Sequence, residues 1–135
     1  MTPSSTATEQ LISGVDFVAL PTHDVRAAAE FYGETLGLRR SVFMPERNFA
    51  EFETGNLTLS IIDAEKMGLE HHEQKTEIAL HVNDVEAARK TLEGRGVAFK
   101  GDILDTGVCH MAFFEDPEGN RLMLHHRYAP RVTED

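Results

Sequence analysis

Two stretches of the chain repeat each other: VALPTHDVRAAAEF at residues 18–31 and IALHVNDVEAARKT at residues 78–91. The offset between them is 60 positions (78 − 18 = 60), and six residues are identical under it. Self-similarity at a fixed offset is the signature of a duplicated structural unit. The sequence therefore predicts two copies of one module.

Each copy has the pattern of a strand followed by a helix. Asp24 and Asp84 directly precede the two alanine-rich segments. We expect both to be N-caps, because an aspartate accepts hydrogen bonds from the free amides of a first helical turn. Three short extended segments follow each helix, at 39–43, 49–53 and 57–63 and at 97–100, 109–114 and 121–126, with turns at 54–56 and 116–120. Each half thus reads strand–helix–strand–strand–strand.

This order predicts an α+β fold of tandem βαβββ modules. A four-stranded sheet with one helix leaves one sheet face uncovered. If the two modules curve together, these faces form a half-open eight-stranded barrel or cup; the alternative is a tandem of ferredoxin-like units without a pocket. We expect a single domain over residues 13–127, with repeats at about 13–63 and 76–127, a polar linker at 64–75, and tails at 1–12 and 128–135.

The composition sets limits on the class of protein. Of 135 residues, 41% are hydrophobic and 27% charged, which is typical of a globular protein. The net charge of −10 argues against binding to nucleic acid or to an anionic membrane, which require a basic surface. No apolar run is long enough to span a membrane, and MTPSSTATEQ at the N-terminus lacks a signal-peptide core, so we expect a cytoplasmic protein. The single cysteine, Cys109, excludes an internal disulfide.

Two longer stretches carry a family resemblance. VDFVALPTHDVRAAAEFYGETLGL at 15–38 and VCHMAFFEDPEGNRLMLHH at 108–126 resemble the opening and closing elements of the vicinal oxygen chelate superfamily, which includes glyoxalase I, extradiol dioxygenases and bleomycin-binding proteins. The resemblance covers about residues 14–126. It implies a cup between the modules, in which the metal-dependent members hold a divalent ion with histidine and glutamate. It also implies a homodimer, an arrangement common in this superfamily.

Transferred by position, the metal ligands of the family fall at Phe17, Ser60, Glu77 and Met123. Phenylalanine and methionine offer no hard ligand, and serine is a poor one. The resemblance therefore implies this fold without the usual metal site, and we expect no cofactor. The alternative is a divalent metal (Fe, Mn, Ni or Zn) at a displaced site built from Glu51, Glu77, His110 and His125.

Period-2 alternation along the strands assigns side chains to the cup. The residues expected to line it are Phe17, Phe49, Glu51, Ser60, Glu77, His81, His110, Phe114, Met123 and His125. An aromatic surface with a few polar groups is typical of a small-molecule site; the alternative is that these polar groups satisfy one another or water at the strand ends. His126 is expected on the opposite face, and His71 and His72, in the polar linker, are expected in solvent.

Two functions follow from this lining. The first is a metal-independent protein that binds a partly apolar small molecule in the cup. The second is a lyase, isomerase or dioxygenase-like enzyme, with Glu77 as general base and His110 as its partner, or with the displaced metal. A third possibility is a non-catalytic assembly partner. The metal ligands missing from the family positions favour the first.

Overall fold

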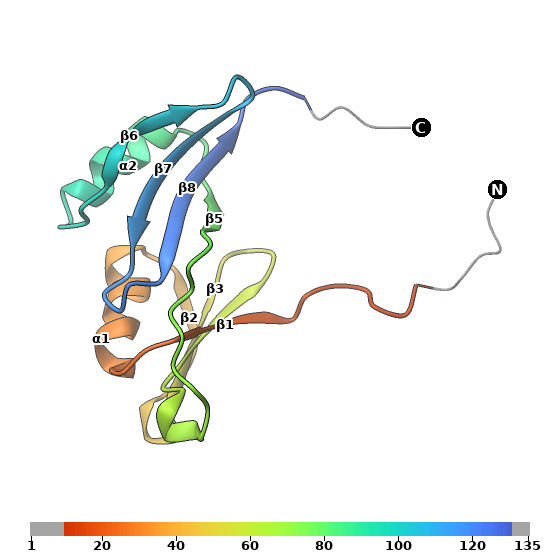
Figure 1. Ribbon diagram of the computed structural model, residues 1–135, viewed down its shortest axis with the longest axis vertical. Coiled ribbons are helices and arrows are strands. Elements are labelled where there is room, and N and C mark those ends of the chain that lie inside the picture. Colours follow the sequence, from red (N-terminus) through yellow and green to blue (C-terminus); the bar gives the residue numbers. More distant parts are fainter. Residues whose placement is uncertain (1–9, 131–135) are drawn as a thin grey trace.

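The computed structural model describes residues 10–130 (Figure 1). The first module contains β1 (Phe17–Pro21), α1 (Val25–Glu30), the π-helical turn η1 (Phe31–Thr35), β2 (Arg39–Met44), the 3₁₀ turn η2 (Pro45–Arg47), β3 (Phe49–Glu53) and β4 (Thr58–Ile62). The linker contains the 3₁₀ turn η3 (Glu65–Met67). The second module contains β5 (Ile78–His81), α2 (Val85–Glu93), β6 (Lys100–Asp105), β7 (Cys109–Glu115) and β8 (Arg121–Arg127). The predicted tails lie mostly outside the described residues.

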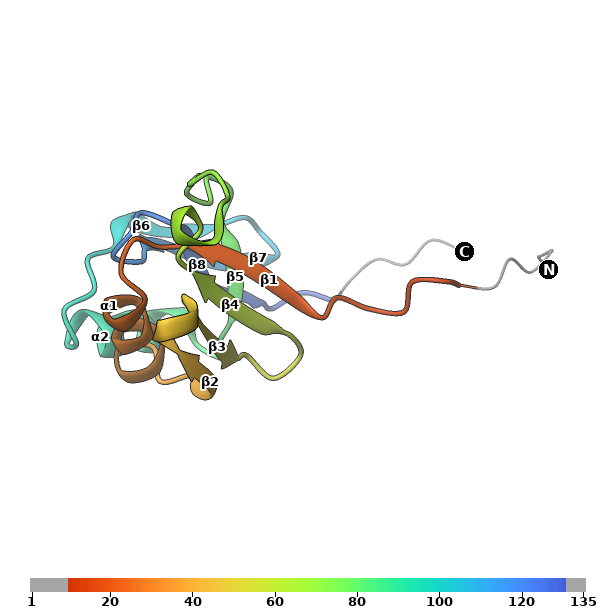
Figure 2. The same ribbon diagram turned by 90° about the horizontal axis from the view of Figure 1, so that it is seen from below.

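The strands form two four-stranded sheets with the same topology. Sheet A has the order β1-β4-β3-β2, which can be followed in Figure 2, and sheet B has the order β5-β8-β7-β6. In each sheet the first strand is parallel to the last, and the other pairs are antiparallel. Over the described part of the chain, the two sheets are separate and do not close into a barrel. The α+β fold of tandem βαβββ modules with an open cup is confirmed.

Both helices begin where the sequence places their caps. The Asp24 carboxylate accepts a hydrogen bond from the Ala27 amide at 3.0 Å, and the Asp84 carboxylate accepts one from the Ala87 amide at the same distance. Each cap satisfies an amide that the first helical turn leaves free. Within the described residues, neither these nor any other helix is long and apolar enough to cross a membrane.

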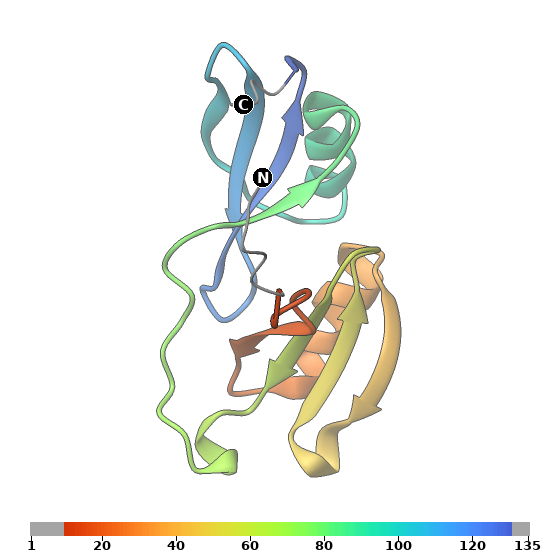
Figure 3. The ribbon, with the colours of Figure 1, turned by 90° about the vertical axis from the view of Figure 1, so that its right-hand side faces the viewer.

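The core lies on the helix side of both sheets and is continuous between the modules. The Phe31 and Phe114 rings, one from each module, have centroids 6.5 Å apart, and Phe99 lies 5.1 Å from Phe114. Fully buried members of this cluster are Leu20, Tyr32, Ala50, Phe52, Leu59, Ile61, Ala112 and Leu122. The modules are stacked one above the other, joined by the linker along one side (Figure 3). The face of each sheet turned away from its helix is called its open face.

One strand differs from its predicted position. The sequence predicts a strand at residues 97–100, but β6 begins only at Lys100 and continues to Asp105. Val97 is 8% exposed and belongs to the core, so its apolar character reflects packing of the loop after α2. β6 contains a bulge after Lys100, where Gly101 adopts a φ of +68°. Such a bulge interrupts the alternation from which a strand is recognised.

Candidate small-molecule site

The open face of sheet A carries one half of the predicted lining. Strand register places Phe17, Phe49, Glu51 and Ser60 on this face, as the alternation predicts. Phe17 is 56% exposed, whereas Ser60 is buried opposite the half-buried Glu51. The open face of sheet A therefore combines an accessible aromatic ring, that of Phe17, with the half-buried carboxylate of Glu51.

Glu53, at the end of β3, lies on the same open face and was not among the predicted site residues. Its carboxylate accepts hydrogen bonds from the hydroxyls of Ser41 and Thr58, the latter at 2.7 Å. These bonds, that from Ser41 first, lower the pKa of Glu53 below its usual value. A hydrogen-bonded carboxylate of this kind stays ionised and gives the face a fixed negative charge.

The open face of sheet B carries the other half. Parallel pairing of β5 with β8 aligns Ala79 with Met123 and His81 with His125, and the same phase places Glu77 on this face. The Glu77 side chain is 26% exposed and lies 3.9 Å from the Arg121 guanidinium. The exposed His81 lies 3.3 Å from the amide oxygen of Asn83. The predicted residues on this face supply a thioether, two imidazoles and a carboxylate next to arginine, and pairing with β8 adds Met111 and Phe113 to it.

The predicted orientations of His110 and Phe114 are wrong. Antiparallel pairing aligns Phe114 with Leu122 and His110 with His126, which puts both on the helix side of sheet B. Phe114 is 1% exposed and belongs to the core. Strand β7 is apolar in both phases, since Met111 and Phe113 alternate with Ala112 and Phe114, so alternation alone does not distinguish its faces. His110 instead lies 3.3 Å from the Asp105 carboxylate and does not meet Glu77.

The residues at the family metal positions do not fit a metal. Phe17 and Met123 offer no hard ligand, the Ser60 hydroxyl is weak, and the Glu77 carboxylate is next to the Arg121 guanidinium. The displaced set is not assembled either, because His110 is on the helix side of sheet B, whereas Glu77 and His125 are on its open face. Neither of these two sets of residues therefore fits a metal ion.

A different group of potential ligands lies at the junction of the modules. His23, His71 and Glu118 each offer one atom, and within the described residues these atoms all lie within 4.8 Å of one another. The side chain of His72 is 78% exposed, as expected for the linker, but that of His71 is only 8% exposed. The expectation that both histidines are in solvent is thus wrong for His71. No spacing rule finds this group, because its residues come from three distant segments.

A duplicated βαβββ module with two open sheet faces defines a class of cup-shaped proteins. The family model for the glyoxalase/bleomycin resistance protein/dioxygenase superfamily matches residues 14–124. The chain belongs to this superfamily. The comparison with curated proteins gives no significant match.

Solved structures of the same fold are numerous. An antibiotic-binding protein from Streptomyces sp. CB03234 is 26% identical, with a TM-score of 0.74 over 88% of this chain and 99% of that one. A glyoxalase/bleomycin resistance protein/dioxygenase from Nocardioides is 22% identical, with a TM-score of 0.71 over 94% and 93%. A lactoylglutathione lyase from Agrobacterium tumefaciens is 18% identical, with a TM-score of 0.73 over 84% and 93%. At these low identities, the similarity to the Nocardioides and Agrobacterium proteins shows a shared fold and does not show a shared function.

Proposed function

We propose that this protein binds a partly apolar small molecule in the cup between its open faces, without the usual metal of the family. The observation that carries the proposal is the chemistry of the four family ligand positions: an aromatic ring, a hydroxyl and a thioether replace hard ligands at three of them, and the fourth, Glu77, lies next to Arg121. Phe17, Phe49 and Met123 offer apolar contact area, and the polar groups beside them offer orientation. The similarity to an antibiotic-binding protein supports a binding role.

The proposed cup is completed by a second copy of the chain. Phe17 is 56% exposed, Leu104 47% and Met44 37%, and strand register places all three on open faces. A second copy packed against these two faces would remove the three apolar side chains from water. Sedimentation equilibrium tests this: we expect a dimer, and we expect Phe17→Asp to shift it towards the monomer. A wild-type monomer at all concentrations would contradict this assembly.

Ligand binding is tested with a panel of aromatic antibiotics, first by thermal shift and then by titration calorimetry. Phe17→Ser should weaken binding of any ligand found by about tenfold, as is usual for the loss of a central aromatic contact. Leu69→Ser is the matched control, because Leu69 is 55% exposed but lies in the linker. Equal affinities for the two variants would overturn the proposed site.

The alternative function, an enzyme, rests on Glu77. Its carboxylate is a partly buried potential base on the open face of sheet B, although Arg121 lies beside it and His110 does not. Glu77→Gln separates the two functions. If Glu77→Gln loses turnover but keeps its ligand affinity, the protein is an enzyme. If the affinity is unchanged and neither the wild type nor the variant shows turnover, the result supports a binding protein.

A further inference from the structure

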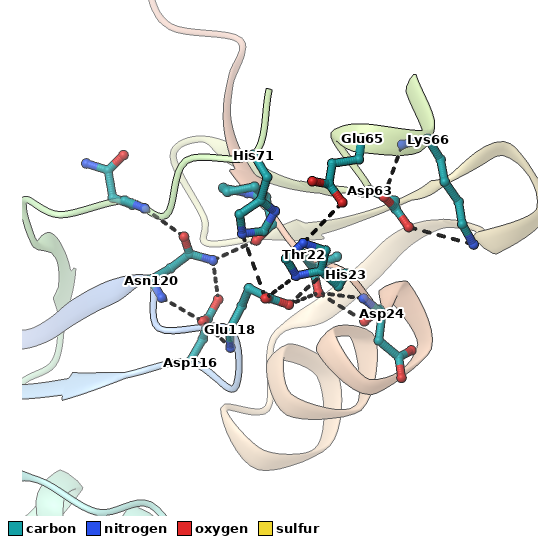
Figure 4. A network of polar contacts seen from close by, with 12 residues as sticks. Thr22, His23, Asp24, Asp63, Glu65, Lys66, His71, Asp116, Glu118 and Asn120 are labelled. Carbon is teal, nitrogen blue, oxygen red and sulfur yellow. Dashed lines mark hydrogen bonds and ion pairs between the residues drawn. The ribbon is translucent and has the colours of Figure 1, made fainter. Parts of the chain in front are cut away.

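Three segments far apart in the sequence meet at one corner of the molecule (Figure 4). His23 lies in the loop between β1 and α1, His71 in the linker, and Glu118 in the turn between β7 and β8. These segments belong to the first module, the connection and the second module, respectively. Any ligand shared by the three side chains would therefore hold both modules and the linker together.

His71 is the feature that points to a missing ligand. Its side chain is 8% exposed, and within residues 10–130 neither of its ring nitrogens has a hydrogen-bond partner. A buried polar group without a partner carries a desolvation penalty, so a buried imidazole is normally hydrogen-bonded or coordinated. The Nε2 atom of His71 lies 3.8 Å from the Oε2 atom of Glu118. A metal ion bound by both atoms would satisfy this ring.

The Glu118 carboxylate is already held in position by the first module. Its Oε1 atom accepts hydrogen bonds from the His23 amide at 2.7 Å and from the Thr22 hydroxyl at 3.1 Å. Its Oε2 atom is 2.6 Å from Nδ1 of His23. One oxygen is thus fixed by the backbone, and the other faces the two imidazoles.

His23 has the outer partner that a metal-bound histidine usually has. Its Nε2 atom lies 3.3 Å from a carboxylate oxygen of Glu65, on the side of the ring away from Nδ1. Metal-binding histidines typically donate their second nitrogen to a carboxylate, which orients the ring and raises its basicity. The side chain of His23 is 53% exposed, which gives an ion and a completing water molecule access to the site.

The rings must rearrange to bind an ion. The imidazoles of His23 and His71 are stacked, with centroids 3.9 Å apart and planes at 15°, whereas a bound metal lies in the plane of each ring. The exposed His23 ring has room to turn out of the stack. Its nitrogen must also move away from Glu118, since ligands about 2.1 Å from a tetrahedral ion are separated by about 3.4 Å.

We propose that His23, His71 and Glu118 bind one divalent transition-metal ion of the zinc class, with water in the remaining position. Two imidazoles and a carboxylate favour such ions over magnesium or calcium, which prefer oxygen ligands. The site is structural and joins the two modules to the linker. It is independent of the ligand proposed for the cup.

The test uses untagged, full-length protein stripped with EDTA and titrated with zinc against a chromogenic chelator. We expect one zinc per chain for the wild type and for His72→Ala, the matched control at the exposed neighbouring position. His71→Ala should bind at least tenfold more weakly. Zinc should also raise the unfolding temperature of the wild type and of His72→Ala but not that of His71→Ala, because a ligand stabilises only the state that binds it.

Three results would overturn the proposal. One is unchanged zinc affinity of His71→Ala, and another is the absence of stoichiometric binding to the wild type at micromolar zinc. The third is loss of zinc binding in Glu77→Gln or His125→Ala, which would place the ion on an open face. If His71→Ala does not fold, X-ray absorption of the zinc-loaded wild type decides: two imidazole ligands support the site, and fewer contradict it.

Discussion

The duplication gives the molecule two junctions between modules, and they differ in chemistry. At the first, the turn Asp116–Asn120 of the second module contacts Pro21 of β1 and Tyr32 of η1 through buried polar groups. At the second, the turn Thr54–Asn56 of the first module approaches β5 and α2 of the second and leaves a cavity of about 570 Å³. Much of its lining is apolar, including Leu36, Leu57, Ile78, Leu92 and Leu124.

The difference arises from one substituted position and from the length of the facing turn, in an otherwise similar framework. Under the 60-residue offset, Tyr32 of the first module corresponds to Leu92 of the second. The Tyr32 hydroxyl donates to Asp116 at 2.7 Å, whereas a leucine has no polar atom to offer the opposite turn. That opposite turn is also shorter, three residues against five. The two modules thus share strand order and helix caps, but the contacts between them differ. One junction is filled by hydrogen-bonded groups, and the other contains a cavity.

Asn120→Ala should have the largest effect, because it removes the centre of the filled junction. Asn120 is fully buried; its amide donates to the Pro21 carbonyl and to Asp116, and its oxygen accepts from the Gln74 amide. Leaving these buried partners unsatisfied should lower the free energy of unfolding by about 3 kcal/mol. Urea denaturation measures this value. The control is Asn56→Ala in the exposed turn of the second junction, which should change it little; equal losses would contradict the comparison.

Tyr32→Phe should have the next largest effect. Burial and the nearby Asp116 carboxylate hold the pKa of Tyr32 well above its usual value, so the phenol stays protonated and donates. Removing a buried hydrogen bond to a charged acceptor should cost about 2 kcal/mol. Tyr128→Phe is the control, since the Tyr128 hydroxyl also donates to an aspartate, Asp105 at 2.8 Å, but the residue is 46% exposed. Thermal unfolding of both variants should show a clear loss only for Tyr32→Phe.

Local features of the fold were predictable from sequence, and contacts between distant segments were not. Spacing predicted the repeat and the caps at Asp24 and Asp84, and alternation predicted the residues on the open face of sheet A. Both patterns are local in the sequence. Alternation did not predict which side chains of β7 face the helix. Both sets of alternating residues contain apolar side chains, and only the pairing with β8 shows which set is on the helix side. For the same reason His71 and His72, adjacent in a polar linker, looked alike until folding buried one of them against Glu118.

Leu57→Ala tests whether the second junction is as loosely packed as its cavity indicates. Leu57 is half-buried and already borders empty space, so its truncation enlarges an existing cavity and creates no new one. We expect a loss of about 1 kcal/mol in the free energy of unfolding, below the usual range for a fully buried leucine. The control is Leu69→Ala, at a 55% exposed position. A loss as large as that of Asn120→Ala would show that this junction is as tightly coupled as the first.

Glu53, at the edge of the second junction, should give the smallest effect, and one that depends on pH. Hydrogen bonds from Ser41 and then from Thr58 lower its pKa from the usual 4.5, so the folded protein holds this proton less tightly than the unfolded chain. The resulting stabilisation is present above pH 4.5 and is lost as the pH falls through the lowered pKa. The difference in unfolding free energy between the wild type and Glu53→Gln should therefore shrink below that pH. NMR titration gives the mechanism: Ser41→Ala should raise the pKa of Glu53 back towards 4.5, and an unchanged value would show that Ser41 does not hold the carboxylate.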